Sequence, residues 1–207
     1  MTNILLAHGS PDTRHGEQVR QLASKTAEIL GEQVGTSFLS EKSLPKGARV
    51  LPLFLGAGKH VLVDAPQLIR ASGCEMLPPL ENQAAQIAEM AMDLATAETR
   101  RVNTLFVIYS FSGFEKLATE LYKQSKRCSK VALASLHAEP SIKAVLEHWQ
   151  QEGLEQVTLQ PMLLFEGRTL DMVQSIADQV ESPQITLGPV LAKHEAMPGL
   201  IADCLRR

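Results

Sequence analysis

The chain has 207 residues, of which 44% are hydrophobic and 21% charged, a composition that suits an ordinary globular protein with one large or two small domains. The formal net charge of −3 and the 4% aromatic content give no support for nucleic acid as a partner, because nucleic-acid-binding domains usually carry a basic excess and stacking rings. The three cysteines are odd in number and widely spaced, so neither a disulfide framework nor a structural zinc site is expected.

The N-terminal sequence MTNILLAHGS predicts a first strand and not a signal peptide, since no basic region precedes a long apolar run. No apolar run in the sequence approaches the length of a membrane span, so we expect no membrane partner. Unpaired thiols are typical of a reducing compartment. We therefore expect a cytoplasmic protein.

Short apolar runs alternate with amphipathic stretches along the first half of the chain. The first run stops at His8-Gly9-Ser10-Pro11, because Gly and Pro end a buried strand. Helical spacing of apolar residues follows and is closed by Gly31. In chain order the predicted elements are a strand at 4–7, a helix at 16–31, strands at 36–39 and 49–55, a helix at 61–71, a strand at 74–77 and a helix at 83–97.

The polar stretch 97–101 is the best candidate boundary, and the pattern restarts after it. Alternation of strands and helices favours parallel sheets covered on both faces. We therefore predict an α/β protein of two tandem flavodoxin-like domains, 1–99 and 100–207, each a parallel four-stranded sheet flanked by helices. The second-half elements are strands at 104–108, 130–136, 156–164 and 184–187, and helices at 114–126, 141–151, 166–180 and 196–206.

Two internal matches indicate a duplication. The segment from Leu51 to His60 resembles the segment from Gln160 to Thr169, and His8 stands where the second half has Tyr109. The halves are unequal, because the second has a full helix between its second and third strands where the first has only 40–48. The first domain has lost a helix there or holds the segment as a loop.

His8 follows the first predicted strand and His60 follows the third, after a Gly-Ala-Gly turn. In a flavodoxin-like strand order these two strands are neighbours, and ligands bind at their carboxyl ends. Imidazoles can hold a borderline divalent metal or accept a proton near neutral pH. Either histidine alone could equally be a capping or loop residue. A nucleotide site is weakly supported, because GxGxxG and GxxxxGK[ST] are absent, and Ser10 lacks the GxSxG context of a hydrolase.

The order and spacing of several motifs resemble the sirohydrochlorin cobaltochelatase and ferrochelatase family. The first half carries His8-Gly9-Ser10 and the pattern PLFLxAGxHxxxD from Pro52 to Asp64. The second half resembles the same family at 136–142, 160–167 and 187–198. The resemblance therefore covers nearly the whole chain.

This resemblance implies two chelatase-like domains around a cleft, with His8 and His60 binding the metal and accepting the pyrrole protons. The second domain has Tyr109 and Thr169 at the corresponding positions, which makes it a degenerate opposite wall. No organic cofactor is implied. A divalent metal, Co²⁺ or Fe²⁺, and sirohydrochlorin are the implied substrates, in sirohaem or cobalamin biosynthesis. A monomer or a homodimer would serve.

Family members often carry Glu at the end of the second strand in an FLE pattern, whereas this chain reads Phe38-Leu39-Ser40-Glu41. The third metal ligand is therefore open between Glu41 and His137. Sirohydrochlorin is rich in carboxylates, so basic groups at the rim are expected to help, and Lys46 lies in one of the relevant loops. The expected substrate-binding residues are Ser10, Arg14, Lys42, Gly58, Lys59 and Arg168.

Two other readings remain open. A tetrapyrrole or metal carrier could keep the fold and the histidine pair without turnover, and the altered Glu position favours it. A flavodoxin-like signalling domain is weaker, because His8-Gly9-Ser10 occupies the place of its acidic cluster.

Overall fold

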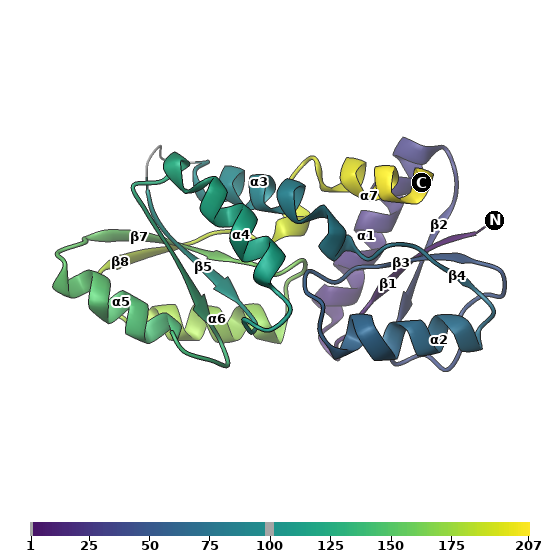
Figure 1. Cartoon of the computed structure of the whole chain (residues 1–207), viewed down its shortest axis with the longest axis horizontal. Coiled ribbons are helices and arrows are strands. Elements are labelled where there is room, and N and C mark those ends of the chain that lie inside the picture. Colours follow the sequence, from purple (N-terminus) through teal and green to yellow (C-terminus); the bar gives the residue numbers. More distant parts are fainter. Residues whose placement is uncertain (1, 98–101) are drawn as a thin grey trace. The chain divides into compact units, whose positions relative to one another are not determined.

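The computed structural model describes residues 2–97 and 102–207 (Figure 1). The chain forms two compact units, one made of Met1–Ala84 with Glu195–Arg207 and the other of Ala85–His194. Apart from Ala97, the predicted boundary stretch 97–101 lies outside the described residues. No helix in the described part of the chain is long and apolar enough to cross a membrane.

The first unit is built on a parallel four-stranded sheet in the order β2-β1-β3-β4. The central strand β1 is buried along its whole length, as its uninterrupted apolar sequence predicts. Its bounds and those of its neighbours are β1 (Asn3–Ala7), β2 (Val34–Phe38), β3 (Arg49–Pro52) and β4 (Glu75–Met76).

Three helices cover the first sheet: α1 (Thr13–Leu30), α2 (Ala65–Ala71) and α7 (Met197–Arg206). Asp12 caps the start of α1 by accepting a hydrogen bond from the backbone of Arg14, and Gly31 ends the helix in the left-handed conformation. A π-helical turn, His60–Asp64, leads directly into α2. We call this segment the π-turn. Helix α2 lies on one face of the sheet, and α1 and α7 lie together on the other (Figure 1).

The second unit repeats this plan with the sheet order β6-β5-β7-β8. Helices α5 and α6 cover one face, and α3 and α4 cover the other (Figure 1). The strands are β5 (Asn103–Ile108), β6 (Lys130–Ser135), β7 (Gln156–Pro161) and β8 (Gln184–Leu187), and the helices are α3 (Ala84–Ala95), α4 (Glu115–Lys123), α5 (Ile142–Gln151) and α6 (Arg168–Asp178).

The strand registers confirm the α/β fold of two flavodoxin-like sheets and match the expected duplication. Pro52 ends β3 opposite Leu6 of β1, and Pro161 ends β7 opposite Val107 of β5. In each unit the residue after the proline donates its backbone N–H to the central strand. Proline lacks that donor, so it suits the last position of a paired strand.

The expected loss of a helix from the first half is confirmed. Residues 39–48 contain turns and no helix or strand. Leu44 and Ala48 are buried in the core that the sheet shares with α2. In the second unit, α5 supplies Ile142, Leu146 and Trp149 to the corresponding core. A loop with two apolar anchors therefore replaces a helical layer.

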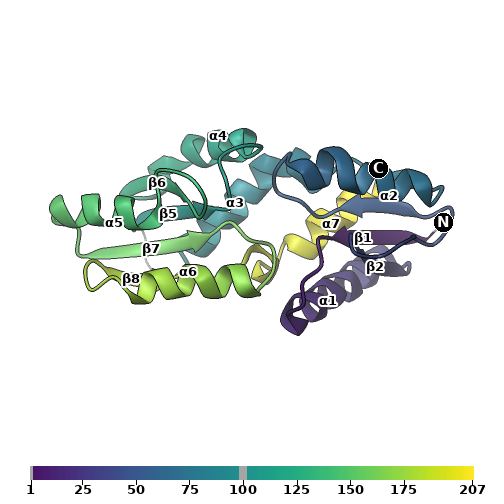
Figure 2. The same cartoon turned by 90° about the horizontal axis from the view of Figure 1, so that it is seen from below.

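The compact units differ from the expected boundaries of 1–99 and 100–207, because α3 belongs to the second unit and α7 to the first. Both views show the yellow helix α7 within the first unit, near the purple α1 (Figure 1, Figure 2). The Arg49 guanidinium donates to the carbonyl of Leu205 at 2.7 Å, and Arg206 donates to the carbonyl of Ile29 at 3.2 Å. Local sequence predicts that a helix has an apolar face, but not which sheet that face covers.

Candidate active site

His8 and His60 come together at the carboxyl ends of β1 and β3, as the sequence predicts. The centres of the two imidazole rings are 4.4 Å apart, with an angle of 71° between the ring planes. Both side chains are exposed to solvent. Neighbouring parallel strands end at the same edge of the sheet, so residues far apart in sequence share one site.

The turn after β1 fixes the position of His8. Gly9 has a φ of 88°, which glycine adopts without strain. A Cβ at this position would lie 3.3 Å from the Cβ of Phe38, so the turn packs closely on the end of β2. The Nδ1 of His8 lies 2.8 Å from the Gly9 carbonyl oxygen. Because a carbonyl oxygen can only accept, this contact places the proton of the neutral ring on Nδ1.

The π-turn fixes the position of His60. The Nδ1 of His60 lies 2.8 Å from Oδ2 of Asp64, four residues later. The ring of Phe54 stacks near the imidazole, with centres 6.2 Å apart and 26° between the planes. A carboxylate accepts the Nδ1 proton of a neutral imidazole, so His60 also keeps its lone pair on Nε2.

Both imidazoles therefore present an unprotonated Nε2 when neutral. A ring centre lies about 3 Å from a metal ion bound through Nε2, so two rings on one tetrahedral ion have centres about 5 Å apart. The observed 4.4 Å is close to that separation. The pair can hold one divalent ion or accept protons from one substrate.

Ser10 and Arg14 follow His8 in the chain and make hydrogen bonds with Asp12 at the start of α1. The Ser10 hydroxyl accepts the backbone N–H of Asp12 at 3.1 Å. The Arg14 guanidinium bonds both carboxylate oxygens of Asp12, with a shortest distance of 2.6 Å. If Ser10 and Arg14 bind substrate, as predicted, they do so while also bonded to Asp12, the residue that caps α1.

The loop before His60 contains the predicted residues Gly58 and Lys59. A Cβ at Gly58 would meet nothing within 4 Å, and the Gly58 carbonyl accepts the N–H groups of Val61 and Leu62. The Lys59 side chain is 76% exposed, with its ammonium 3.8 Å from Oδ1 of Asp64. Lys42 and Lys46 are exposed in the loop after β2. These cations are accessible to an anionic ligand.

The third metal ligand stays a prediction. The Glu41 carboxylate accepts the backbone N–H of Phe38 at 3.1 Å, which holds it at the end of β2. Within residues 2–97 and 102–207, no three His, Cys, Asp or Glu side chains form a group arranged to hold a metal ion. The two imidazoles are the protein groups that this geometry brings together.

In the second unit the corresponding strand ends carry a different pair. Tyr109 follows β5, and its ring centre lies 4.5 Å from that of His137, which follows β6. Ser135 donates to the Tyr109 carbonyl and accepts the backbone N–H of His137. Arg168 is the exposed first residue of α6, and Thr169 follows it where the first unit has His60.

Two residues near the pair were not among the predicted site residues. Asp64 belongs to the quoted motif, and its spacing of four from His60 was a signal that it could reach the ring. His15, on the first turn of α1, gave no such signal. Burial lowers the pKa of His15 below its ordinary value, the charge of His8 acts in the same direction, and Asp12 opposes both.

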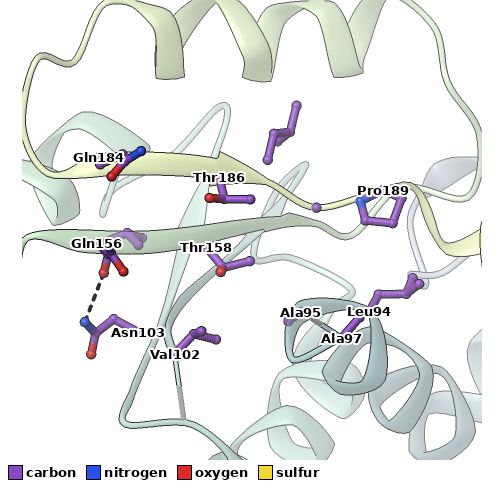
Figure 3. Close-up of a pocket in the computed structure, with 13 residues that line it drawn as sticks. Leu94, Ala95, Ala97, Val102, Asn103, Gln156, Thr158, Gln184, Thr186 and Pro189 are labelled. Carbon is purple, nitrogen blue, oxygen red and sulfur yellow. Dashed lines mark hydrogen bonds between the residues drawn. The ribbon is translucent and has the colours of Figure 1, made fainter. Parts of the chain in front are cut away.

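Two hollows lie elsewhere on the units. One, of about 480 Å³, lies along α2 and is lined by Leu62, Val63, Pro66, Gln67, Arg70 and Ala71. The other, of about 370 Å³, lies in the second unit between α3 and the sheet (Figure 3). Asn103, Gln156 and Gln184 line it from the amino ends of β5, β7 and β8 (Figure 3). Neither hollow is lined by the histidine pair.

The family model CbiX matches residues 109–207. Over these residues the chain is similar to the CbiX family. No curated protein matches the sequence. The match covers the half of the sequence without the histidine pair, so it does not by itself assign a role to His8 or His60.

Solved structures resemble the chain over almost its full length. SirB from Bacillus subtilis with Fe³⁺ has a TM-score of 0.76 at 15% identity, covering 99% of this chain and 94% of SirB. SirB from Bacillus subtilis subspecies spizizenii, a sirohydrochlorin chelatase in complex with cobalt, has a TM-score of 0.73 at 16% identity, covering 99% and 93%. CbiX, described as the terminal enzyme for biosynthesis of siroheme in denitrifying bacteria, has a TM-score of 0.72 at 15% identity, covering 100% and 98%. At such identities the likeness shows the shared fold.

Proposed function

We propose that this protein is a CbiX-like chelatase that inserts a divalent metal ion into a tetrapyrrole, with His8 and His60 as the reactive pair. The observation that carries the proposal is the 4.4 Å separation of the two rings, each with Nδ1 bonded to an oxygen acceptor. The similar SirB structure, named as a sirohydrochlorin chelatase, and the similar CbiX structure, named as the terminal enzyme of siroheme biosynthesis, support sirohydrochlorin as the tetrapyrrole. Co²⁺ and Fe²⁺ are the proposed metals.

The two imidazoles can supply both functions that metal insertion requires, holding the metal ion and accepting protons. A free-base macrocycle loses two N–H protons as it takes up a divalent cation. The Nε2 lone pair of a neutral imidazole can hold the incoming ion; once the ion has passed to the macrocycle nitrogens, the same lone pair can accept a pyrrole proton and release it to solvent, so two imidazoles account for the two protons. His8 and His60 are exposed, so this proton has a direct route to water. No organic cofactor is required by this sequence of steps.

The substrate's carboxylates would be met by cations on the loops around the strand ends. Lys59 stands immediately before His60, and Lys42 follows β2, so both belong to the unit that carries the pair. Arg14 could contribute while bonded to Asp12. The role of Arg168 in substrate binding stays a prediction, and so does the choice of Glu41 or His137 as the third metal ligand. A cytoplasmic location and a monomeric or homodimeric state are also predictions.

The test is the absorption spectrum of sirohydrochlorin under anaerobic conditions, followed after addition of Co²⁺ or Fe²⁺. Wild-type protein should accelerate conversion of the free-base spectrum to the metallated spectrum. The double variant His8→Ala with His60→Ala should not. Tight binding of sirohydrochlorin without metal-dependent acceleration would reject the chelatase and identify the carrier that keeps the same fold.

A further inference from the structure

We infer that Asp64 is a positioning residue, which holds His60 in the tautomer that leaves Nε2 free for the metal ion. The inference rests on the proposed function, because it assigns His60 to metal binding, but the contact between Asp64 and His60 does not depend on that function. Asp64 Oδ2 lies 2.8 Å from His60 Nδ1, which is closer than the 3.8 Å between Asp64 Oδ1 and the Lys59 ammonium. Outer carboxylates of this kind set the orientation and basicity of a ligating imidazole.

A purely structural role for Asp64 fits the contacts poorly. Asp64 stands at the N-cap position of α2, but its side chain makes no capping hydrogen bond. Its other partner is Lys59, whose ammonium is 3.8 Å away on a side chain that is 76% exposed. Exposed ion pairs of this length contribute little to stability. The bond to His60 is therefore the main interaction of the carboxylate.

The π-turn adds a second observation. The backbone N–H of Ala65 bonds to the carbonyl of His60, five residues earlier, which widens this turn relative to an α-helix. Within this turn His60 and Asp64 are paired, whereas Leu62 and Val63 between them are 66% and 50% exposed. Single π-turns recur at functional sites, where they aim particular side chains.

The second copy of the motif within this chain supplies an internal comparison. Aligning Gly58 with Gly167 places Thr169 at the position of His60 and Val173 at the position of Asp64. The copy has therefore lost the carboxylate along with the imidazole. Its helix α6 starts at Arg168 in ordinary α form, and Val173 is fully buried in the core. The His, the Asp and the π-turn thus occur together in one copy and are all missing from the other.

The test uses the full-length chain and the variants Asp64→Asn and Asp64→Glu. Long-range ¹H–¹⁵N spectra of the histidine rings, assigned with His60→Ala, report which nitrogen carries the proton. Wild-type His60 should carry it on Nδ1. In Asp64→Asn the amide can donate to Nδ1, so the proton should move to Nε2, as happens when an orienting Asp is replaced by Asn in a serine protease. Asp64→Glu should restore part of the wild-type signal.

Co²⁺ binding, followed by visible absorption without any tetrapyrrole, is the second readout. Asp64→Asn should weaken it by about 10- to 100-fold, the usual effect of losing such an outer partner. Glu152→Gln is the matched control, because Glu152 forms an i,i+4 pair with His148 on α5 of the second unit. Glu152→Gln should change neither the His60 tautomer nor Co²⁺ affinity. Lys59→Ala should leave the tautomer unchanged, since the acceptor is still present.

The inference stands only if Asp64→Asn changes both the His60 tautomer and the Co²⁺ affinity. An unchanged tautomer, or a changed tautomer with wild-type affinity, overturns it. If Asp64→Asn does not fold, the same two readouts are made on Asp64→Glu. If His60 no longer carries its proton on Nδ1 in that variant and Co²⁺ still binds with wild-type affinity, the positioning role is overturned. Absence of chelatase turnover in the wild type would reject the proposed function alone, because neither readout requires turnover.

Discussion

Replacing His8 or His60 by Ala should separate loss of chemistry from loss of fold. The His60 side chain is 46% exposed, and its bond to Asp64 is a surface contact. Losing an exposed contact of this type costs about 1 kcal/mol of unfolding free energy. With a total stability of about 5–15 kcal/mol, nearly all molecules of either variant stay folded. The melting temperature should fall by only about 2–4 °C.

The chelatase rate should fall much further. Removing a general base alone typically costs about 100- to 10,000-fold, and here a metal ligand is lost as well. His8 and His60 are expected to act on one ion, so the double variant should be little slower than the slower single variant. A simple product of the two single losses would mean that the residues act independently.

The assay is the initial rate of metallation of sirohydrochlorin, measured with the wild type, both single variants and the double variant. Folding is checked by circular dichroism and the melting temperature. His148→Ala is the matched control, since His148 is 67% exposed on α5 and belongs to the other unit. Near-normal rates in both single variants would refute the assignment of metal insertion to this pair and would redirect attention to Glu41 and His137.

Three further predictions use the same preparations. Tyr109→Phe should keep most of the rate, because the hydroxyl lies in the unit without the histidine pair, and abolished turnover there with an active His8→Ala would reverse the choice of active half. Gly9→Ala should lower the free energy of unfolding more than Gly47→Ala does. Both glycines have positive φ, which costs about 1–2 kcal/mol for Ala, but only the new Cβ at position 9 would also crowd Phe38. Equal losses in urea melts of the two variants would contradict this reasoning. The pKa of His15 is lowered in the folded protein, so the contribution of His15 to the free energy of unfolding should be fully present above the ordinary pKa of 6.5 and should be lost as the pH falls from there towards the folded pKa. His15→Gln should flatten this loss in urea midpoints measured between pH 8 and 5. An unchanged slope in the variant would contradict the prediction.

The strands and helices could be predicted from the sequence where a local pattern of apolar residues determines the secondary structure. The apolar run of β1 and the helical spacing of α1 are examples. The ends were harder: the strand predicted at 49–55 stops at Pro52, because its partner strand β1 is paired only as far as Leu6 in that register. The helix predicted from residue 16 starts at Thr13, since the Asp12 cap sets its first turn.

The histidine pair could be predicted because it depends on topology, which the alternating pattern already implies. Two strand ends at adjacent positions bring His8 and His60 together whatever the details of the loops. Asp64 required more, since its contact with His60 depends on the conformation of the π-turn. Neither the hydrophobic pattern nor the resemblance distinguishes a π-turn from the start of an α-helix.

The placement of α3 and α7 shows how the two halves differ from two independent domains. In each half the helix that follows the last strand leaves its own sheet, so that α3 completes the second unit and α7 the first. Arg49 at the start of β3 bonds the C-terminal turn of α7, and Arg206 bonds the last turn of α1. A chain ending before Glu195 would therefore expose the face of α1 that α7 covers, even though the entire histidine site precedes residue 65. We therefore expect the stability of the first unit, which carries His8 and His60, to depend on α7 at the end of the chain.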